Sequence, residues 1–411
     1  MNIAGVISEY NPFHKGHAYH IAQTRAMLGA DTGIVCVMSG NYVQRGEPAV
    51  FEKHARALAA ILTGADLVLE LPLPFVLSSA EGFADGAVAL LDKLKCVDYL
   101  SFGSESGEIH QLKQAAELLL DPRLIPYLKE ALKTGVSYAE ARQTAAEALF
   151  NELYINAAAR DSDRYRKLNV MSAPNNILAI EYIKSVLKRK SQITPVTVKR
   201  IGAGHDEADH MNGPASASRL RQKLREGLDI WDDLPMSAMI VFREELESGF
   251  APVIIDTLET AVLSKLRTMS ADDFMNLPDA SEGLGLRLMK YAREGISPEA
   301  ILDKAKTKRY ARSRIRRMLM CAYLGITNDS KPEAPPYARV LACNARGRSI
   351  INLIDNNMPV ITKPAGVRRL GGAAEALFEL EARSTDLYVL GYPNESHRAG
   401  GQEWKIGPEI V

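Results

Sequence analysis

The chain has 411 residues, which at about 150 residues per domain predicts two or three domains and a full-sized core. It is 46% hydrophobic and 24% charged, which excludes a disordered, collagen-like or coiled-coil chain. Basic and acidic residues both number 50, so a surface for a polyanion must be a local patch. The cysteines form no Cys-x-x-Cys pair, and no apolar run reaches the roughly 18 residues that span a membrane. We therefore expect a cytoplasmic protein without membrane segments.

The first 110 residues alternate between apolar strand-like runs and helical stretches. The predicted strands are residues 3–8, 33–38, 65–71 and 97–102, and the predicted helices are 17–28, 52–62 and 78–94. This alternation predicts βαβ crossovers and a parallel sheet. Ligands of such sheets bind beyond the carboxyl ends of the strands, so the residues that follow each strand are the candidate site.

The rest of the chain is predicted to be mostly helical. Residues 111–170 read as helices, 193–201 as a strand, 216–225 as a helix and 231–330 as helices again, followed by a proline-rich linker at 328–336. The tail reads as a strand at 338–342, a helix at 349–355, a strand at 360–362, a helix at 373–382 and a strand at 387–390. We therefore expect an α/β domain at 1–230 and a C-terminal region at 231–411, helical to 330 and ending in a small α/β tail at 337–411.

The strongest local pattern is Asn-Pro-Phe-His-Lys-Gly-His at residues 11–17, between the first strand and a helix. Its His-x-Gly-His core places His14 and His17 at a helix N-terminus, where free N–H groups and the helix dipole favour a phosphate. Gly16 lets the backbone approach a polyphosphate, and the imidazoles can stabilise charge on an α-phosphate under attack. The alternative is a surface turn that holds two histidines by chance. The strand-turn-helix context favours the phosphate site.

Polar residues follow the later strands as well. After the second strand come Gly40, Asn41, Gln44 and Arg45, then Lys53 and Arg56, and Gly103 closes the fourth strand. Residues 216–219 (SASR) offer hydroxyls at a helix start, which suit either a phosphate contact or an N-cap. We expect these segments to meet at one edge of the sheet, although each by itself also fits a solvated loop or an ordinary turn.

The clearest charge cluster is the segment 304–317 (KAKTKRYARSRIRR), which holds eight cations and no acid. Ala311, Ile315 and Met318 recur at helical spacing, which predicts one packed face and leaves the cations to solvent. Such a helix suits the phosphate backbone of a structured RNA, and Tyr310 could stack on a base. The alternative is a solvated charged face, which self-repulsion without compensating acids makes less favourable.

Eight segments in order resemble the bacterial tRNA(Met) cytidine acetate ligases. They are NPFHKGH, SGNYVQRGEP, GADLVLELP, SAEGFADGA, FGSE, APNNILAIEYIK, ITPVTVKRIGAG and KRYARSRIRRML. The resemblance implies a Rossmann-like nucleotidyltransferase fold of the HIGH superfamily, with an ATP-binding catalytic domain at 1–230 and a tRNA-binding region at 231–411. In one departure from the family pattern, His205 follows Gly204 directly, without an intervening tyrosine.

The resemblance also implies which residues form the sites. Catalysis would rest on His14, Lys15 and His17. ATP would be bound by Val6, Ile7, Ser8, Glu9, Tyr10, Asn11, Pro12, Phe13, His14, Gly16, His17, Gly103, Asn175 and Arg200, with Asn176 as the neighbouring alternative to Asn175. The tRNA would be contacted by Lys308, Arg309, Arg312, Arg316 and Arg317.

The implied reaction converts acetate and ATP to acetyl-adenylate and pyrophosphate, then moves the acetyl group to the exocyclic amine of the wobble cytidine of elongator tRNA(Met). The chemistry is consistent, because acetate has a poor leaving group and the cytosine amine is a weak nucleophile. Mg²⁺ is expected with ATP, although the sequence identifies no metal ligands. Two other classes stay open: a small-molecule adenylyltransferase that makes a dinucleotide cofactor, and a non-catalytic RNA-binding protein.

Overall fold

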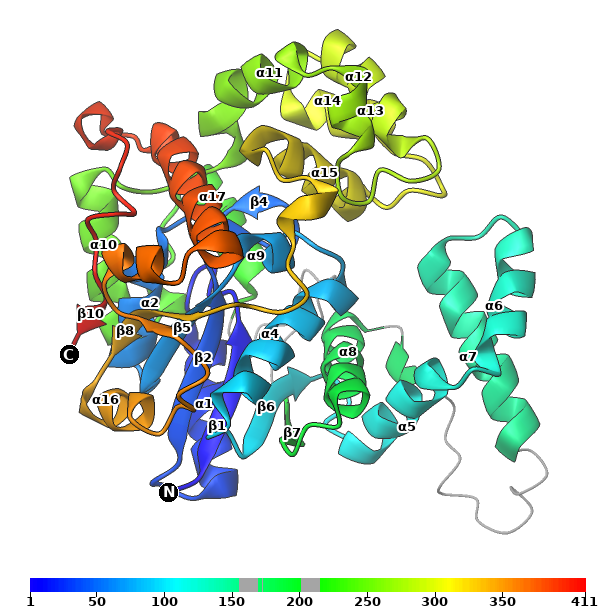
Figure 1. Ribbon diagram of the computed structural model, residues 1–411, viewed down its shortest axis with the longest axis horizontal. Helices are drawn as coiled ribbons and strands as arrows, with labels where there is room; N and C mark the ends of the chain where they lie inside the picture. The colour runs from blue at the N-terminus through cyan, green and yellow to red at the C-terminus, as the bar shows by residue number, and fades with distance from the viewer. Residues whose placement is uncertain (155–168, 172, 201–214) are drawn as a thin grey trace.

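The computed structural model describes residues 1–154, 169–171, 173–200 and 215–411. A central sheet is flanked by helices, with a group of helices beyond one end of it and a helical hairpin projecting at one side (Figure 1). The described strands are β1 (Ile3–Ser8), β2 (Gly33–Ser39), β3 (Tyr42–Val43), β4 (Glu47–Pro48), β5 (Leu67–Leu71), β6 (Tyr99–Ser104), β7 (Thr194–Lys199), β8 (Ala338–Cys343), β9 (Val360–Ile361) and β10 (Glu409–Ile410).

The α-helices fall into two sets along the chain. Up to residue 225 they are α1 (Lys15–Leu28), α2 (Lys53–Leu62), α3 (Leu73–Val76), α4 (Ala80–Leu94), α5 (Ile109–Leu120), α6 (Leu124–Lys133), α7 (Tyr138–Tyr154), α8 (Pro174–Arg189) and α9 (Ala217–Arg225). Beyond it they are α10 (Met236–Ser248), α11 (Glu259–Thr268), α12 (Ala271–Met275), α13 (Leu284–Glu294), α14 (Pro298–Ala305), α15 (Arg312–Leu324), α16 (Ala345–Ile351) and α17 (Gly372–Tyr388). The projecting hairpin in Figure 1 is α6 and α7.

The central sheet has the strand order β10-β8-β5-β2-β1-β6-β7, with β9 beside β8. The five strands from β5 to β7 are parallel, which confirms the predicted α/β fold. β1 pairs with β2 on one side and with β6 on the other, so the strand order reverses at β1. A crevice at such a reversal, beyond the carboxyl ends of β1 and β6, is where doubly wound sheets bind ligands.

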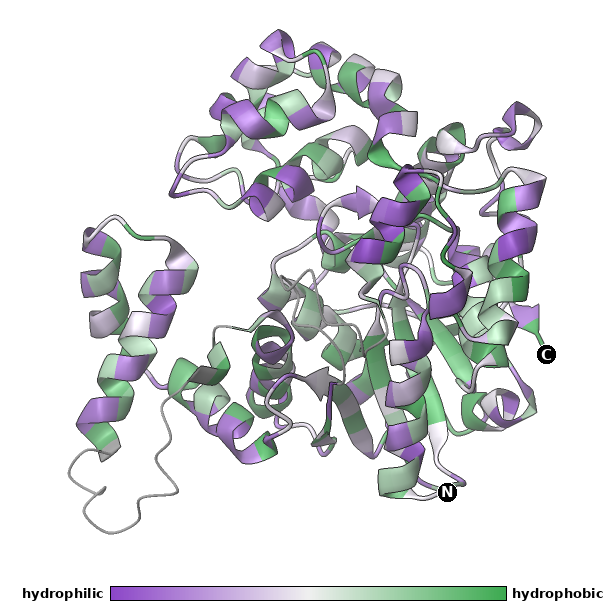
Figure 2. Cartoon of the chain, turned by 180° about the vertical axis from the view of Figure 1, so that it is seen from behind, coloured by the Kyte–Doolittle hydropathy of each residue, from purple (hydrophilic) through white to green (hydrophobic). Residues whose placement is uncertain are grey.

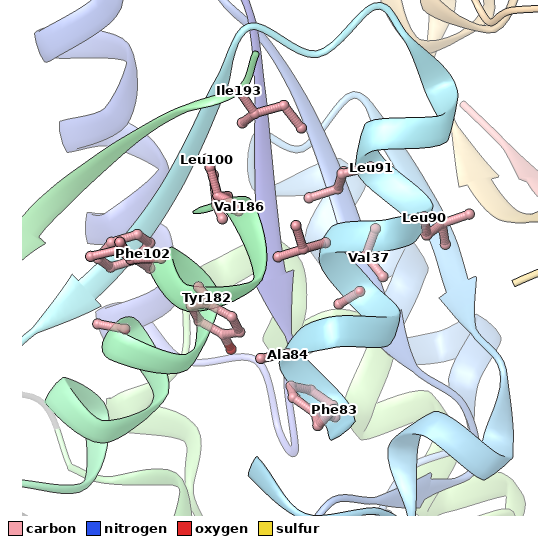
Figure 3. Packing of buried hydrophobic residues seen from close by; sticks show 14 of the residues in the cluster. Val37, Phe83, Ala84, Leu90, Leu91, Leu100, Phe102, Tyr182, Val186 and Ile193 are labelled. Atoms are coloured by element: carbon pink, nitrogen blue, oxygen red, sulfur yellow. The ribbon is translucent and has the colours of Figure 1, made fainter. Parts of the chain in front are cut away.

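Side chains of the inner strands alternate between two cores, as the two-residue period of a strand requires. Val35 and Val37 pack on the face covered by α4 and α8, where Leu91 of α4 also lies (Figure 3). Ile34 and Cys36 pack on the opposite face, against α2 and α10. The strands are accordingly apolar along their length, whereas most helices show one polar side (Figure 2).

The predicted helical stretch after residue 231 is occupied by α10 to α15. Ile315 and Met318 of α15 are buried in a core shared with α11, α13 and α17, which confirms these two members of the predicted apolar stripe, whereas Ala311 is exposed and precedes the helix. The basic segment is not one helix, however. α14 ends at Ala305 and α15 begins at Arg312, and the intervening residues form a turn.

The C-terminal tail does not form a sheet of its own. β8 runs antiparallel to β5, with Leu67 opposite Cys343, and β9 and β10 pair with β8. The separate α/β unit expected at 337–411 is therefore an extension of the central sheet. The strand predicted at 387–390 is also wrong. α17 continues to Tyr388, and a 3-10 turn follows at Val389–Gly391. The helical conformation holds here because Tyr388 and Val389 both pack into the core of the helical region.

Candidate active site

A cavity of about 230 Å³ opens at the carboxyl ends of β1 and β6. It lies at the reversal of strand order, where the fold predicts a ligand. Of the residues predicted to bind ATP, the lining contains Val6, Ile7, Ser8, Glu9, Tyr10, Asn11, His17, Gly103, Asn175 and Arg200. The structure therefore brings together residues from segments that lie almost 200 positions apart in the chain.

The other predicted residues lie beside the cavity and do not line it. They are Pro12, Phe13, His14, Lys15 and Gly16. Phe13 is fully buried and packs edge-on against Tyr10, with 4.7 Å between the ring centroids. Lys15 is exposed, and its Nζ donates to the backbone oxygen of Asp232 at 2.5 Å. The position of Lys15 thus offers no support for the catalytic role that we expected.

His14 and His17 are fixed by the start of α1. His14 is the N-cap residue, and its Nδ1 accepts from the backbone N–H of Gly16 at 3.0 Å. His17 Nδ1 accepts in return from the backbone N–H of His14 at 3.2 Å. The two rings are in contact, with their centroids 3.9 Å apart and their planes tilted by 31°. Because both Nδ1 atoms accept, each neutral ring carries its proton on Nε2, where it can be donated to a ligand.

Burial keeps these imidazoles neutral. It lowers the pKa of His14 to about 4, with a further contribution from the Arg200 cation. It also holds the pKa of His17 well below its usual value, and the neighbouring His14 acts in the same direction. Both rings are therefore uncharged hydrogen-bond donors at neutral pH. Oriented neutral donors of this kind can stabilise charge that develops on a phosphate.

The loop after β2 forms the second side of the cavity. Gln44 and Arg45 line it, as the polar pattern of this loop predicted. The loop is tied to β1 because the backbone N–H of Gln44 donates to Glu9 Oε1 at 2.6 Å. Burial raises the pKa of Glu9, while the cations of Arg221, Arg45 and Arg56 oppose the shift. Glu9 thus joins the two loops that border the cavity.

The third side is formed where α8 begins. Glu105 accepts from Nδ2 of Asn175 at 2.6 Å and from the backbone N–H of Asn176 at 2.9 Å. Asn176 is buried, and its own Oδ1 accepts from the backbone N–H of Glu105 at 3.0 Å. Asn175 is therefore the asparagine that lines the cavity, and Asn176 holds the turn. A Cβ atom on Gly103 would stand 3.2 Å from the Arg200 side chain, so glycine there admits the arginine to the cavity.

Sequence reasoning missed several lining residues. His20, Phe83, Tyr182 and Arg221 line the cavity but were not predicted, and Ser218 does so within the 216–219 segment. His20 Nε2 lies 3.0 Å from Ser101 Oγ, and burial lowers the pKa of His20 to about 4. The signal for His20 was present, since it follows His17 by three residues on the same helix face. Phe83 and Tyr182 sit in core-like patterns that give no such signal.

Four predicted edge residues hold the loop after β2 in place. They are Gly40, Asn41, Lys53 and Arg56, which do not line the cavity. Arg56 is fully buried and donates to backbone oxygens at the ends of β1 and β2, including those of Glu9 and Ser39. Asn41 Oδ1 accepts from the backbone N–H of Lys53 at 2.9 Å. These polar side chains therefore hold the loop after β2 in the position where Gln44 and Arg45 line the cavity.

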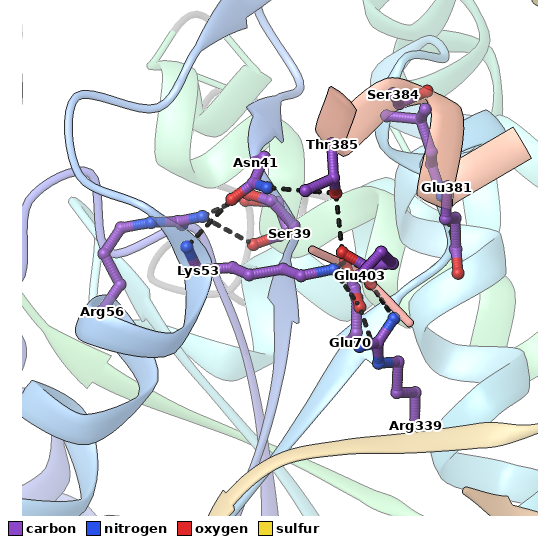
Figure 4. A network of polar contacts seen from close by, with 12 residues as sticks. Ser39, Asn41, Lys53, Arg56, Glu70, Arg339, Glu381, Ser384, Thr385 and Glu403 are labelled. Carbon is purple, nitrogen blue, oxygen red and sulfur yellow. Dashed lines mark hydrogen bonds and ion pairs between the residues drawn. The ribbon is translucent and has the colours of Figure 1, made fainter. Parts of the chain in front are cut away.

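Lys53 also belongs to a buried ion network that joins the two ends of the chain (Figure 4). Its Nζ lies 2.8 Å from Glu70 and 2.5 Å from Glu403. Arg339 of β8 pairs with the same two carboxylates, and Thr385 of α17 donates to Glu403 at 2.7 Å. All these charged side chains are almost fully buried. The network thus joins the C-terminal tail to Lys53 at the start of α2, and the backbone N–H of Lys53 in turn donates to Asn41 in the loop after β2.

The basic segment is compensated by acids from several parts of the chain, some close in sequence and some distant. Arg312 pairs with Glu299 and Asp303, Arg316 with Glu47, Arg317 with Asp279, and Arg309 with Glu282. Our expectation of an uncompensated cationic face is therefore wrong for these arginines. The predicted base stacking by Tyr310 is also wrong, since its ring is buried and its hydroxyl donates to the backbone oxygen of Glu282. Lys304, Lys306 and Lys308 remain exposed.

Gly46 shows how closely α15 packs on the β3–β4 turn. Its φ is +78°, and a Cβ atom there would stand 2.6 Å from the backbone nitrogen of Arg317. Arg316 continues the contact through Glu47. Arg316 and Arg317 therefore lie where the helical region joins the sheet.

The described residues contain no group of three or more His, Cys, Asp or Glu side chains arranged to hold a metal ion. None of the described helices is long and apolar enough to cross a membrane. His205, where the sequence departs from the family pattern, lies outside the described residues.

Comparisons with known proteins cover nearly the whole chain. Residues 1–403 match the HIGH Nucleotidyl Transferase family. The tRNA(Met) cytidine acetate ligase of Acetivibrio thermocellus is 36% identical over 98% of both chains, and that of Clostridium kluyveri is 40% identical over 95% of both. The crystal structure of Thermotoga maritima TmcAL bound with alpha-thio ATP superposes with a TM-score of 0.88 at 32% identity, covering all of both chains. The chain therefore belongs to the tRNA(Met) cytidine acetate ligase family of HIGH nucleotidyltransferases.

Proposed function

We propose that this chain uses ATP to activate acetate as acetyl-adenylate and transfers the acetyl group to the wobble cytidine of elongator tRNA(Met), forming N4-acetylcytidine. The observation that carries the proposal is the placement of His17 in the cavity at the reversal of strand order, with an Nε2–H group that none of the described residues engages. The binding of alpha-thio ATP by the Thermotoga maritima relative supports ATP as the nucleotide. The similarity over the full chain favours this ligase over a small-molecule adenylyltransferase or a non-catalytic RNA-binding protein.

In the first step, a carboxylate oxygen of acetate attacks the α-phosphorus of ATP, and pyrophosphate leaves with the electrons of the broken P–O bond. Negative charge builds up on the oxygens of the α-phosphate as this occurs. We assign its stabilisation to the Nε2–H group of His17 and to the cations of Arg200 and Arg221, which line the cavity, while the backbone N–H of His14 beside the cavity orients the ring of His17. The chain then needs no covalent intermediate, only positioning and charge stabilisation.

We assign ATP binding to the end of β1 and the turn after it, from Val6 to Asn11, together with Gly103, Asn175 and Arg200. The N-terminus of α1 follows this turn, and the helix dipole there favours the phosphates, although the N–H of Gly16 is already taken by His14 Nδ1. Ser218, near the N-terminus of α9, adds a second helix start at the same cavity. Mg²⁺ would arrive with the phosphates of ATP. The described residues provide no ligand cluster for it, so we assign it no step.

In the second step, the exocyclic amine of cytosine attacks the acetyl carbonyl of the adenylate. A C–N bond forms, the bond from the carbonyl carbon to the phosphate oxygen breaks, and AMP leaves while the amine loses a proton. The mixed anhydride suits this step because AMP is a far better leaving group than the oxygen of free acetate. Activation and transfer can therefore be measured separately.

For tRNA we propose that exposed cations at the turn between α14 and α15 contact the phosphate backbone. Lys308 is exposed, and Arg309 is 65% exposed at its side chain despite its ion pair with Glu282. Arg312, Arg316 and Arg317 are more engaged, so their contribution to tRNA binding would be smaller than their sequence pattern implied. Exposed lysines release counterions on binding a phosphate, which makes the affinity depend on salt.

The experiment is to incubate the protein with ATP, labelled acetate and elongator tRNA(Met). We expect label in the RNA at the wobble cytidine, together with acetate-dependent exchange of pyrophosphate into ATP. Exchange with a nucleotide-like acceptor and no labelled RNA would favour the small-molecule adenylyltransferase. Tight binding of tRNA without either reaction would favour the non-catalytic protein. Either of these results would overturn the proposal.

A further inference from the structure

A second cavity, of about 440 Å³, adjoins the first one. It lies between α9 and the residues that follow β4 and α10. Ser218 and Arg221 line both cavities, so the two share a wall on α9. A molecule in the second cavity would therefore lie against two side chains that also border the site of adenylation.

The walls of the second cavity differ in character. Pro48, Val50, Ile254 and Ile255 form an apolar wall, and the facing side of α9 forms a polar one. Its volume is within the range of about 300–1,000 Å³ that is typical of small-ligand sites. An apolar wall opposite a polar one suits a nucleotide, whose base has apolar faces and whose phosphate is charged.

On the polar wall, Arg225 is a cation without an acidic partner in the part of the chain that the structure describes. Glu47 is engaged by Arg316 and lies 3.8 Å from Arg221, and Glu226 accepts from Gln222 Nε2 at 3.0 Å. Arg225 is exposed, lines the cavity and contacts no acid among the described residues. A free arginine at the edge of a cavity is a ready partner for a phosphate.

We propose that the second cavity holds the nucleotide of the tRNA that receives the acetyl group, with its base against the apolar wall and its phosphate at Arg225. The inference rests on the proposed transfer to a cytidine of tRNA. Arg221 Nη2 donates to Ser218 Oγ at 3.2 Å, so this hydrogen bond must open for the exocyclic amine to reach the acetyl-adenylate in the first cavity. An enzyme that acts on a base must take that base out of its stack, and this cavity gives the extruded base a place.

The position of the cavity agrees with this path. Glu47 lines it and also pairs with Arg316 of α15, so the cavity lies between the first cavity and the helical region. An RNA held by exposed lysines of the helical region would reach the adenylate through this passage. Acetate and ATP bind in the first cavity and do not use the second one. Loss of Arg225 should therefore affect transfer to tRNA and leave activation of acetate unchanged.

The test compares transfer with activation in the full-length protein. We would measure acetate-dependent pyrophosphate exchange, and single-turnover transfer from enzyme-bound acetyl-adenylate to saturating elongator tRNA(Met). In Arg225→Ala, and in Ile254→Trp, which fills the cavity, the ratio of transfer to exchange should fall at least about tenfold, the loss expected from one charge-assisted contact. Exchange also reports that each variant is folded.

The matched control is Lys133→Ala on α6. Its side chain is a cation that is 73% exposed, and no residue of α6 lines either cavity. Its ratio should equal that of the wild type. If either Arg225→Ala or Ile254→Trp keeps the wild-type ratio, the cavity does not hold the acceptor nucleotide. Wild-type labelling of tRNA is measured first, so a failure of the proposed function would be seen separately.

Discussion

The geometry of His17 gives a sharp prediction, because its two ring nitrogens have different tasks. Nδ1 accepts from the backbone N–H of His14 at 3.2 Å and so caps α1, whereas Nε2 is left to donate in the cavity. His17→Asn keeps an acceptor at the place of Nδ1 and removes the donor. His17→Gln keeps a donor at the place of Nε2 and removes the acceptor. The two variants therefore separate stability from catalysis.

The expected magnitudes follow from these contacts. Loss of one oriented donor to developing charge lowers the rate by about 100- to 1,000-fold, so His17→Asn should reduce acetate-dependent pyrophosphate exchange by that factor. Its free energy of unfolding should stay close to that of the wild type. His17→Gln should lose about 0.5–1.5 kcal/mol of stability with the cap hydrogen bond and retain more of the exchange rate. Filter binding of tRNA should be nearly unaffected in both.

The assays are pyrophosphate exchange at saturating ATP and acetate, and urea unfolding followed by circular dichroism. The reasoning would be refuted if His17→Asn exchanged pyrophosphate at the wild-type rate. It would also be refuted if both variants lost the same stability, because the cap would then not depend on Nδ1.

Three further predictions concern stability, each measured by urea unfolding. Gly46→Ala should cost about 1–3 kcal/mol more than Gly135→Ala, because both positions have positive φ but only the first would bring a Cβ atom against a neighbouring backbone; equal costs would contradict the close packing of α15. Lys53→Met should cost about 3–5 kcal/mol, because two buried carboxylates are then left to share the cation of Arg339, and adding Glu403→Gln should restore part of it; a fully additive double variant would argue against the network. Burial lowers the pKa of His20 to about 4 from its usual value of 6.5, so the unfolded chain binds the proton first as the pH falls. The free energy of unfolding should therefore fall by up to about 3 kcal/mol from pH 6.5 to 4. His20→Gln should reduce this decline, and an unchanged decline would show that another group causes it.

The cavity was predictable where its residues follow local rules. A strand, a turn with His-x-Gly-His and a helix are adjacent in sequence, so the position of His17 at the cavity follows from the pattern between residues 3 and 28. The end of β6 at Gly103 follows from the same alternation of strands and helices. Phe83 and Tyr182 could not be assigned, because a side chain that lines a cavity and one that fills a core have the same periodicity in the sequence.

The prediction that the basic segment 304–317 is uncompensated was wrong for a different reason. The partners Glu47 and Asp279 lie 269 and 38 residues from Arg316 and Arg317, so the local charge count gave no sign of them. The tail failed in the same way, since pairing of β8 with β5 joins residues more than 270 positions apart. Long-range pairing decides both features, and neither can be read from a window of sequence.

The insertion of β8 beside β5 constrains how this protein can be made and dissected. During synthesis the edge of β5, whose residues Leu67–Leu71 are all buried in the finished molecule, has no neighbour until residue 343 has left the ribosome. An unpaired apolar strand edge invites association with other chains. A fragment ending near residue 230 should therefore aggregate rather than fold, and nascent chains of this enzyme should depend on chaperones until the last third of the polypeptide has emerged.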